Sequence, residues 1–213
     1  MRRIHKGVEP RSLAEHRRNG GIYKSYKERD DVGQALLRDQ GAICCYCMQR
    51  ISLRRMRVEH WVSQTSAPKR TLDYDNLLGA CTGGENTLPV PQQHCDVSRH
   101  ETKLHLNPAQ PPPTCEQLVR YLPTGEITSD NDHVKNDVVK TLNLNTRHLV
   151  EIRKRLTDEL RSTLGREGPD SHWPPELIQT HLARWRNRTK TGEYREYCQV
   201  VIYYLEKKLK KKA

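Results

Sequence analysis

Phenylalanine is absent from this chain of 213 residues, and hydrophobic residues of all kinds make up only 34% of it. Charged residues contribute a further 30%. A chain with so few apolar side chains builds a small core, and a small core commonly needs added support such as a bound metal. Because 213 residues suffice for one modest domain or two small ones, the length leaves the number of domains open.

Long apolar runs are missing as well. No stretch approaches the roughly 20 apolar residues that a membrane-spanning helix needs. The residues from Met1 to Lys6 contain neither an apolar stretch nor a small-residue cleavage site. We therefore expect a soluble, cytoplasmic protein without a membrane partner. In that compartment, the seven cysteines predict metal ligation or free thiols and not disulfides.

The net charge of +11 is unevenly distributed along the chain. Residues 1–70 contain 16 Lys and Arg against 7 Asp and Glu, and five more lysines lie between Lys207 and Lys212. The residues between these segments are slightly acidic. Basic side chains bind phosphates with release of counterions, so this distribution predicts a polyanion as partner of the N-terminal half. A solvated basic surface without a partner is the alternative.

Apolar periodicity predicts helices in two parts of the chain. The first covers 29–38 and ends at Gly41. Three more follow the middle of the chain: one with leucines from 149 to 164 and Asn145 as its cap, one that begins at Pro174, and one over 194–209. Between these two parts, 57–62 is rich in β-branched and aromatic residues and predicts a short strand.

A proline-rich segment is the best candidate for a domain boundary. Residues 108–113 contain four prolines in six positions, a composition that cannot continue a helix and favours extended backbone. We therefore divide the chain into residues 1–107, with a helical segment at its start, and a helical region over 114–213. The predicted fold class is α+β and mainly helical.

The cysteines predict a structural zinc site. Cys44 and Cys47 form a C-x2-C pair, whose sulfur atoms sit on one tight turn and can reach the same ion. Cys81 and Cys95 are the candidates for the other two ligands, and His94 is the alternative to Cys95. Such a site can contribute on the order of 10 kcal/mol to folding, which would suit a thin core.

Candidate site residues lie between the halves of this cysteine frame and directly after it. Glu59 and Asn76 both fall there, His60 follows Glu59 directly, and Asp96 follows Cys95. In a strand, Glu59 and His60 point to opposite faces, so that one can bind a metal while the other handles a water molecule. A Glu-His pair alone is commonplace, and its position in the frame is what makes it informative.

In this order of residues the chain resembles the HNH endonuclease superfamily, which has the ββα-metal fold. More narrowly, it resembles the PtuB-type HNH proteins of Septu and retron-linked anti-phage systems. The likeness covers roughly the first 160 residues and rests on these stretches: 1–4 and 7–10, 39–47, 58–64, 72–81, 94–96, 120–127 and 142–145. The chain departs from the usual pattern by having Glu at the first metal position and Asp at the last, which leaves the preferred metal open.

The resemblance implies a metal-dependent cleavage of nucleic-acid phosphodiester bonds. His60 would be the general base, because a neutral imidazole accepts a proton from water near pH 7. Glu59 and Asp96 would bind one Mg²⁺ or Mn²⁺, ions that prefer oxygen ligands. Asn76 would brace the loop and orient His60. Arg99, three residues after Asp96, would face a phosphate of the substrate.

The resemblance also implies partners. These are a PtuA-type ABC-like ATPase that controls the nuclease, a DNA or transfer RNA substrate, and, in retron-linked relatives, a complex of reverse transcriptase and noncoding RNA. We expect the helical region over 114–213 to be the docking surface, because it is nearly neutral apart from its C-terminal lysines and carries apolar stripes. The alternative function is a zinc-stabilised nucleic-acid-binding or adaptor module whose HNH site is inactive.

Overall fold

The computed structural model describes residues 1–167 and 173–210, so Lys211 and Lys212 of the basic end lie outside the described residues. The described part is a mixed α and β structure with two small antiparallel sheets. Its strands are β1 (Arg57–His60), β2 (Leu77–Ala80), β3 (Arg120–Tyr121) and β4 (Ile127–Thr128). Its α-helices are α1 (Arg11–Arg18), α2 (Arg29–Gln40), α3 (Asp96–Arg99), α4 (Cys115–Leu118), α5 (Asp132–Asn136), α6 (Arg147–Glu167), α7 (Pro175–Arg186) and α8 (Cys198–Lys210).

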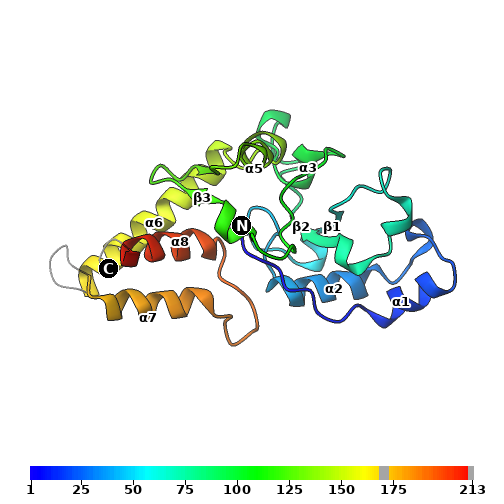
Figure 1. Cartoon of the computed structure of the whole chain (residues 1–213), viewed down its shortest axis with the longest axis horizontal. Coiled ribbons are helices and arrows are strands. Elements are labelled where there is room, and N and C mark those ends of the chain that lie inside the picture. The colour runs from blue at the N-terminus through cyan, green and yellow to red at the C-terminus, as the bar shows by residue number, and fades with distance from the viewer. Residues whose placement is uncertain (168–172, 211–213) are drawn as a thin grey trace.

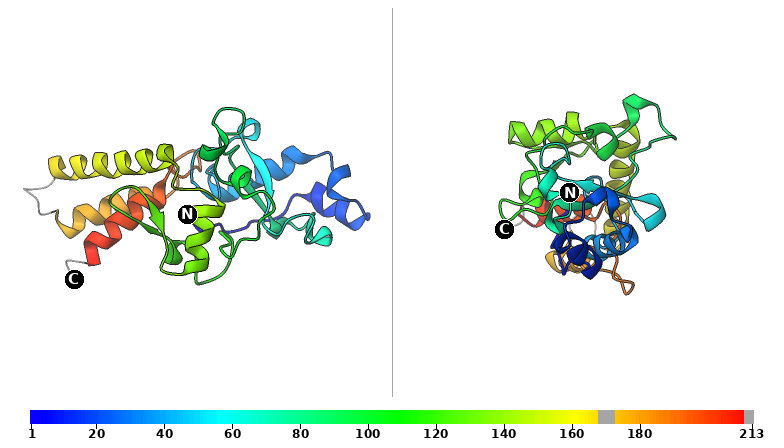
Figure 2. Two further views of the ribbon diagram at one scale, coloured as in Figure 1. Left: turned by 90° about the horizontal axis from the view of Figure 1, so that it is seen from above. Right: turned by 90° about the vertical axis from the view of Figure 1, so that its right-hand side faces the viewer.

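The molecule is elongated, with different elements at its two ends. Helices α1 and α2 lie with the β1–β2 sheet at one end, and α6, α7 and α8 lie at the other (Figure 1). The same separation is seen from above, where α8 runs beside both α6 and α7 (Figure 2). The β3–β4 hairpin packs near α8, so it belongs to the helical end.

Helix α2 forms where the sequence predicts it and runs two residues further, to Gln40. Its apolar side, including Val32, Ala35 and Leu36, is buried. The helix ends because Gly41 adopts a left-handed conformation with φ of 59°. A Cβ atom at this position would lie 2.5 Å from the ring of Tyr194, so there is no room for a side chain here.

The β1–β2 sheet is short but well fixed. The strands are antiparallel, with Glu59 opposite Leu78 and His60 opposite Leu77. Gln40, at the end of α2, bonds the backbone of Gly79 twice: its Oε1 accepts from the amide nitrogen at 2.6 Å and its Nε2 donates to the carbonyl at 2.8 Å. These bonds hold the buried strand β2 against α2.

The three C-terminal helices exist as predicted, with two corrections at their starts. Helix α8 begins at Cys198 and not at Tyr194, because Tyr197 has a φ of 54° that no helix allows and Tyr194 donates its amide to Gly41 O at 2.9 Å. Asn145 does not cap α6. Its Oδ1 instead accepts from Ile127 N at 2.8 Å, so it joins β4 to the start of α6.

The hydrophobic core is continuous across the proline-rich segment 108–113. One cluster of buried side chains contains Met48 and Leu78 from the first part and Leu149 and Leu205 from the second. A smaller cluster lies between α1, α2 and the β1–β2 sheet. Among the described residues, no helix combines the length and apolar character required to cross a bilayer.

Candidate metal centre and candidate active site

The cysteine-rich turn presents two thiols from one hairpin. Cys44 N donates to Gln49 O at 2.8 Å, and the chain reverses through Met48, whose φ is 69°. Cys44 and Cys47 both lie on this turn and are almost fully buried. The C-x2-C spacing therefore brings its two sulfur atoms together, as expected from the sequence.

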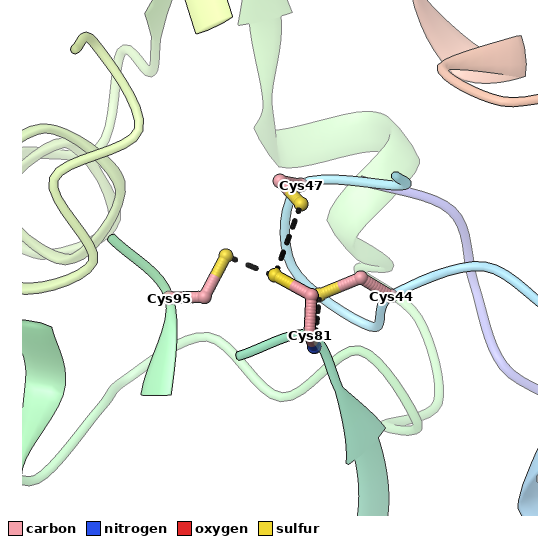
Figure 3. Close-up of side chains that lie close together, drawn as sticks. All are labelled: Cys44, Cys47, Cys81 and Cys95. Atoms are coloured by element: carbon pink, nitrogen blue, oxygen red, sulfur yellow. Dashed lines mark hydrogen bonds between the residues drawn. The ribbon is translucent and has the colours of Figure 1, made fainter. Parts of the chain in front are cut away.

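Cys81 and Cys95 complete a cluster of four sulfur atoms that all lie within 4.8 Å of one another. Cys81 follows β2 and Cys95 precedes α3, and Figure 3 shows the four side chains converging. The Sγ atoms of Cys44 and Cys95 are 3.9 Å apart, and those of Cys47 and Cys81 are 3.7 Å apart. These separations exceed a disulfide bond of about 2.05 Å and match the edge of about 3.8 Å of a tetrahedron with Zn–S distances near 2.3 Å. The cluster is compatible with structural zinc.

Backbone amides point at these sulfur atoms. Cys44 Sγ accepts from Tyr46 N at 3.5 Å and from Cys81 N at 3.3 Å, and Cys47 Sγ accepts from Gln49 N at 3.5 Å. Hydrogen bonds to sulfur favour the thiolate form, which is the form that ligates metal. The surrounding backbone is thus already arranged for a negatively charged cluster.

The structure places Cys95, and not His94, in the fourth position of the cluster. His94 is buried beside it, with Nδ1 3.1 Å from Cys95 Sγ. The histidine therefore contacts a sulfur of the cluster without being one of the four residues. The other three cysteines, Cys45, Cys115 and Cys198, are buried and unpaired.

Glu59 and His60 are adjacent on β1, and both are buried. Their side chains have different surroundings, as strand alternation requires. Glu59 Oε1 accepts a hydrogen bond from Tyr46 Oη at 2.8 Å and another from Arg99 Nη1. His60 contacts the ring of Tyr23 and the loop after β1.

Asp96 begins α3 and lies against the Glu59 carboxyl group. Burial, with the neighbouring Asp96 carboxylate, raises the pKa of Glu59 to about 8. Arg57 approaches Asp96 from the other side, with Nη1 3.6 Å from Oδ2. Two carboxyl groups in contact repel each other when both are ionised, and a cation placed between them removes that repulsion. The pair is therefore suited to hold a divalent ion with oxygen ligands.

The contacts of His60 assign its tautomer. Nε2 lies 3.0 Å from the backbone oxygen of Thr71. A carbonyl oxygen only accepts, so Nε2 carries the proton and Nδ1 keeps its lone pair. The amide of Gln64 is 3.4 Å from Nδ1. Burial lowers the pKa of His60, so the ring is neutral near pH 7 and Nδ1 can accept a proton.

Asn76 holds together the two ends of the loop that follows β1. Its Oδ1 accepts from Val62 N at 2.8 Å, and its Nδ2 donates to Val62 O at 3.0 Å and Arg70 O at 3.2 Å. Arg70 precedes Thr71, whose carbonyl oxygen accepts from His60. Asn76 thus braces the loop that orients His60 without touching the imidazole itself.

Arg99 does not face solvent, contrary to the expectation that it meets a phosphate. Its side chain is 1% exposed, and it donates to Glu59 and to backbone oxygens of residues 60, 61 and 102. The reason is the phase of α3, which has only four residues and places its last side chain inward against Tyr46 and Glu59. A buried guanidinium requires such partners. Arg99 therefore supports β1 from within.

An open cleft of about 450 Å³ lies beside these groups, and Asp96 and Gln64 form part of its wall. Tyr23 also lines the cleft and meets the His60 ring edge-on, with centroids 4.5 Å apart. Two cationic side chains, Arg29 and Arg57, line it as well. Its full lining is Tyr23, Arg29, Asp30, Gly33, Leu53, Met56, Arg57, Val58, Gln64 and Asp96.

Sequence reasoning did not identify Tyr23, Arg29 and Gln64 as site residues. The excess of basic residues in 1–70 indicated that this part of the chain is positively charged, but it did not indicate which residues line the site. Tyr23 and Arg29 come from a 3-10 turn and the start of α2, and only the fold brings them to the cleft beside His60. Gln64 lies in the loop four residues after His60. A comparison of the chain with protein-family models and with curated proteins found no match.

Proposed function

We propose that this protein is a metal-dependent endonuclease of the HNH type that hydrolyses phosphodiester bonds of nucleic acids. The observation that carries the proposal is the arrangement of His60 behind the wall of a cleft that contains Arg29 and Arg57, close to the paired carboxyl groups of Glu59 and Asp96. The order β1, β2, α3 around a four-cysteine cluster supports it, because it is the order of a ββα-metal module.

Two metals have separate roles in this proposal. Zinc on the four cysteines holds the turn, the end of β2 and the start of α3 together. Glu59 and Asp96 would hold Mg²⁺ or Mn²⁺, which prefer carboxylate oxygens. When bound there, such an ion neutralises charge on a phosphate oxygen and on the leaving 3′ oxygen.

The residues of the chain supply the base and the positioning. His60 Nδ1 removes a proton from the attacking water, and the bond from Nε2–H to Thr71 O fixes the ring and stabilises the imidazolium that forms. Arg29 and Arg57 bind backbone phosphates in the cleft. These contacts do not distinguish DNA from RNA, so both duplex DNA and transfer RNA are substrates to test.

One observation favours the alternative, an inactive binding or adaptor module. Glu59 Oε1 already accepts from Arg99 and Tyr46, so part of its charge is neutralised without a metal. In that case the cleft would bind nucleic acid and cleave nothing.

Cleavage assays separate the two functions. The purified protein is incubated with supercoiled plasmid or transfer RNA and Mn²⁺ or Mg²⁺, with and without the ATPase partner that the HNH resemblance implies. We expect one substrate to be cut, and His60→Ala to lower the rate by about 10² to 10⁴, as for loss of a general base. His133→Ala, at an exposed position outside the cleft, is the control. Equal cleavage by wild type and His60→Ala, or binding without cleavage, would refute the nuclease.

We also propose that the ATPase partner docks on the helical end. A shallow groove between α7 and α8 contains the exposed Ala183 and the apolar Leu182 and Leu209. Ala183→Arg should abolish co-purification with the ATPase, while Thr180→Arg, exposed on the same helix outside the groove, should not. Retention of the ATPase by both variants would place the docking surface elsewhere.

A further inference from the structure

A second cavity lies at the helical end of the molecule, away from the candidate active site. Its volume is about 170 Å³, and it is bounded by α6, α8 and the turn after β3. In Figure 1 these elements lie on the opposite side of the N-terminus from β1 and β2. No residue lines both this cavity and the cleft beside His60, so the two are independent.

The walls of this cavity are aromatic and aliphatic. Tyr203 and Tyr204 of α8 are half-buried, and Tyr203 meets the buried Tyr121 edge-on with ring centroids 5.6 Å apart. Leu122 is 42% exposed and extends the apolar wall to the rim of the cavity. Flat rings held by packing offer a surface on which another planar ring can stack.

Three cations surround these rings, and no carboxylate lines the cavity. Arg161 donates from Nε to Tyr204 Oη at 2.9 Å, and its Nη1 is 3.8 Å from Asp158 on the outer side of α6. Lys208 Nζ is 5.6 Å from the centre of the Tyr204 ring, and Lys207 is exposed beside it. A ligand that satisfies both the rings and the cations must combine a planar apolar group with an anion.

We propose that this cavity binds a nucleotide, with its base against Tyr203 and Tyr204 and its phosphate at Arg161, Lys207 and Lys208. Base stacking on aromatic rings beside cationic side chains is how proteins hold nucleotides without reading their sequence. The same chemistry fits a free mononucleotide or one exposed nucleotide of a single strand.

Calorimetric titration of the full chain, without added Mg²⁺ or Mn²⁺, tests the site. The probes are adenosine 5′-monophosphate, adenosine and ribose 5-phosphate. We expect the complete nucleotide to bind at least about tenfold more tightly than either part, because only the nucleotide engages both rings and cations. The double variant Arg161→Glu with Lys208→Glu should weaken nucleotide binding by at least about tenfold.

The matched control is Arg155→Glu with Lys210→Glu. It changes the same two helices by the same charge at exposed positions that do not line the cavity, and it should leave the affinity within about twofold of wild type. Thermal melts of both variants exclude loss of the fold. Equal weakening by both variants, equal affinity for ribose 5-phosphate and the nucleotide, or no saturable binding overturns the proposal.

A single-stranded adenylate tetranucleotide identifies the source of the ligand. Tighter binding than the mononucleotide, lost in the Arg161→Glu, Lys208→Glu variant, assigns the cavity to a strand. Equal binding assigns it to a free nucleotide. Because His60→Ala leaves this cavity untouched, nucleotide binding by that variant separates failure here from failure of the proposed nuclease.

Discussion

His60 combines burial with a fixed tautomer, and both affect when it can act. Burial disfavours the charged imidazolium and lowers its pKa below the ordinary value of 6.5. The neutral form, which is the base, therefore dominates at pH 7. At saturating metal we expect the cleavage rate to be flat near neutrality and to fall as the pH drops below 6.5, measured as single-turnover rates against pH.

The metal dependence should carry a second, separate pH effect. Glu59 has a pKa of about 8 before a cation binds, so binding of Mn²⁺ must displace its proton. As the pH falls below about 8, the apparent affinity for Mn²⁺ should fall by up to about tenfold per unit. Calorimetry in buffers of different ionisation enthalpy would detect the released proton. A pH-independent affinity would remove Glu59 from the metal site.

Substitution of Arg99 tests whether this side chain stabilises the fold or contacts the substrate. Above pH 8, where Glu59 is ionised, Arg99→Met leaves this buried carboxylate without its cationic partner, and loss of one partner of a buried ion pair costs about 3–5 kcal/mol. Urea unfolding with zinc in excess should show this loss, and the exposed Arg54→Met should not. Unchanged stability with a raised KM would instead indicate a phosphate contact.

At the residue level, the spacing of the cysteines predicted which side chains come together, whereas the spacing of the charged residues did not predict which way their side chains face. Four thiols close enough to share one ion have few alternative arrangements, so the spacing indicated Cys44, Cys47 and Cys81 and left Cys95 and His94 as alternatives for the fourth position. Arg99 was misjudged because three residues along a four-residue helix do not define which side faces the core. Tyr23 meets His60 from 37 positions away in the sequence, and no local pattern records such a contact.

At the level of elements, the four-cysteine cluster brings together a turn, the end of β2 and the start of α3. We expect the purified protein to contain an equimolar amount of zinc, measured by elemental analysis. Removal of the ion by a chelator should lower the helical circular dichroism signal, because a structural zinc site contributes on the order of 10 kcal/mol.

The ligand assignment has its own controls. Cys81→Ser should reduce zinc content sharply. Cys115→Ser should retain it, because Cys115 is equally buried but lies outside the cluster. Equal zinc content in the two variants would contradict the assignment.

The long helices could be predicted from the sequence, and the small elements could not. Apolar spacing identified α2, α6 and α7, because each buries one side over at least three turns. Strands β3 and β4 have two residues each, too few to show alternation. The start of α8 was misplaced because Tyr194 and Tyr197 continue its apolar stripe while their backbone does not continue its helix.

At the level of the whole molecule, the continuous core argues that the two predicted parts fold together. A fragment ending at Asn107 would expose the side chains that pack against Leu149, Val201 and Leu205. We expect this fragment to be insoluble or to lack a cooperative thermal transition, and the full chain to melt in one transition seen by both tryptophan fluorescence and circular dichroism. A soluble, cooperatively folding fragment would show that residues 1–107 are a domain.

The hydrogen bonds between the cysteine turn and the segment before α8 affect the order in which parts of the protein fold during synthesis. Arg50 N donates to Glu196 Oε1 at 2.8 Å, and Tyr197 N donates to Met48 O at 3.1 Å; the first pair is 146 residues apart in sequence. A ribosome adds about 5–20 residues each second, so many seconds pass between the synthesis of the turn and the synthesis of these partners. During translation the cysteines are therefore exposed to zinc before the turn can be closed, and the candidate nuclease is assembled only after most of its chain has emerged.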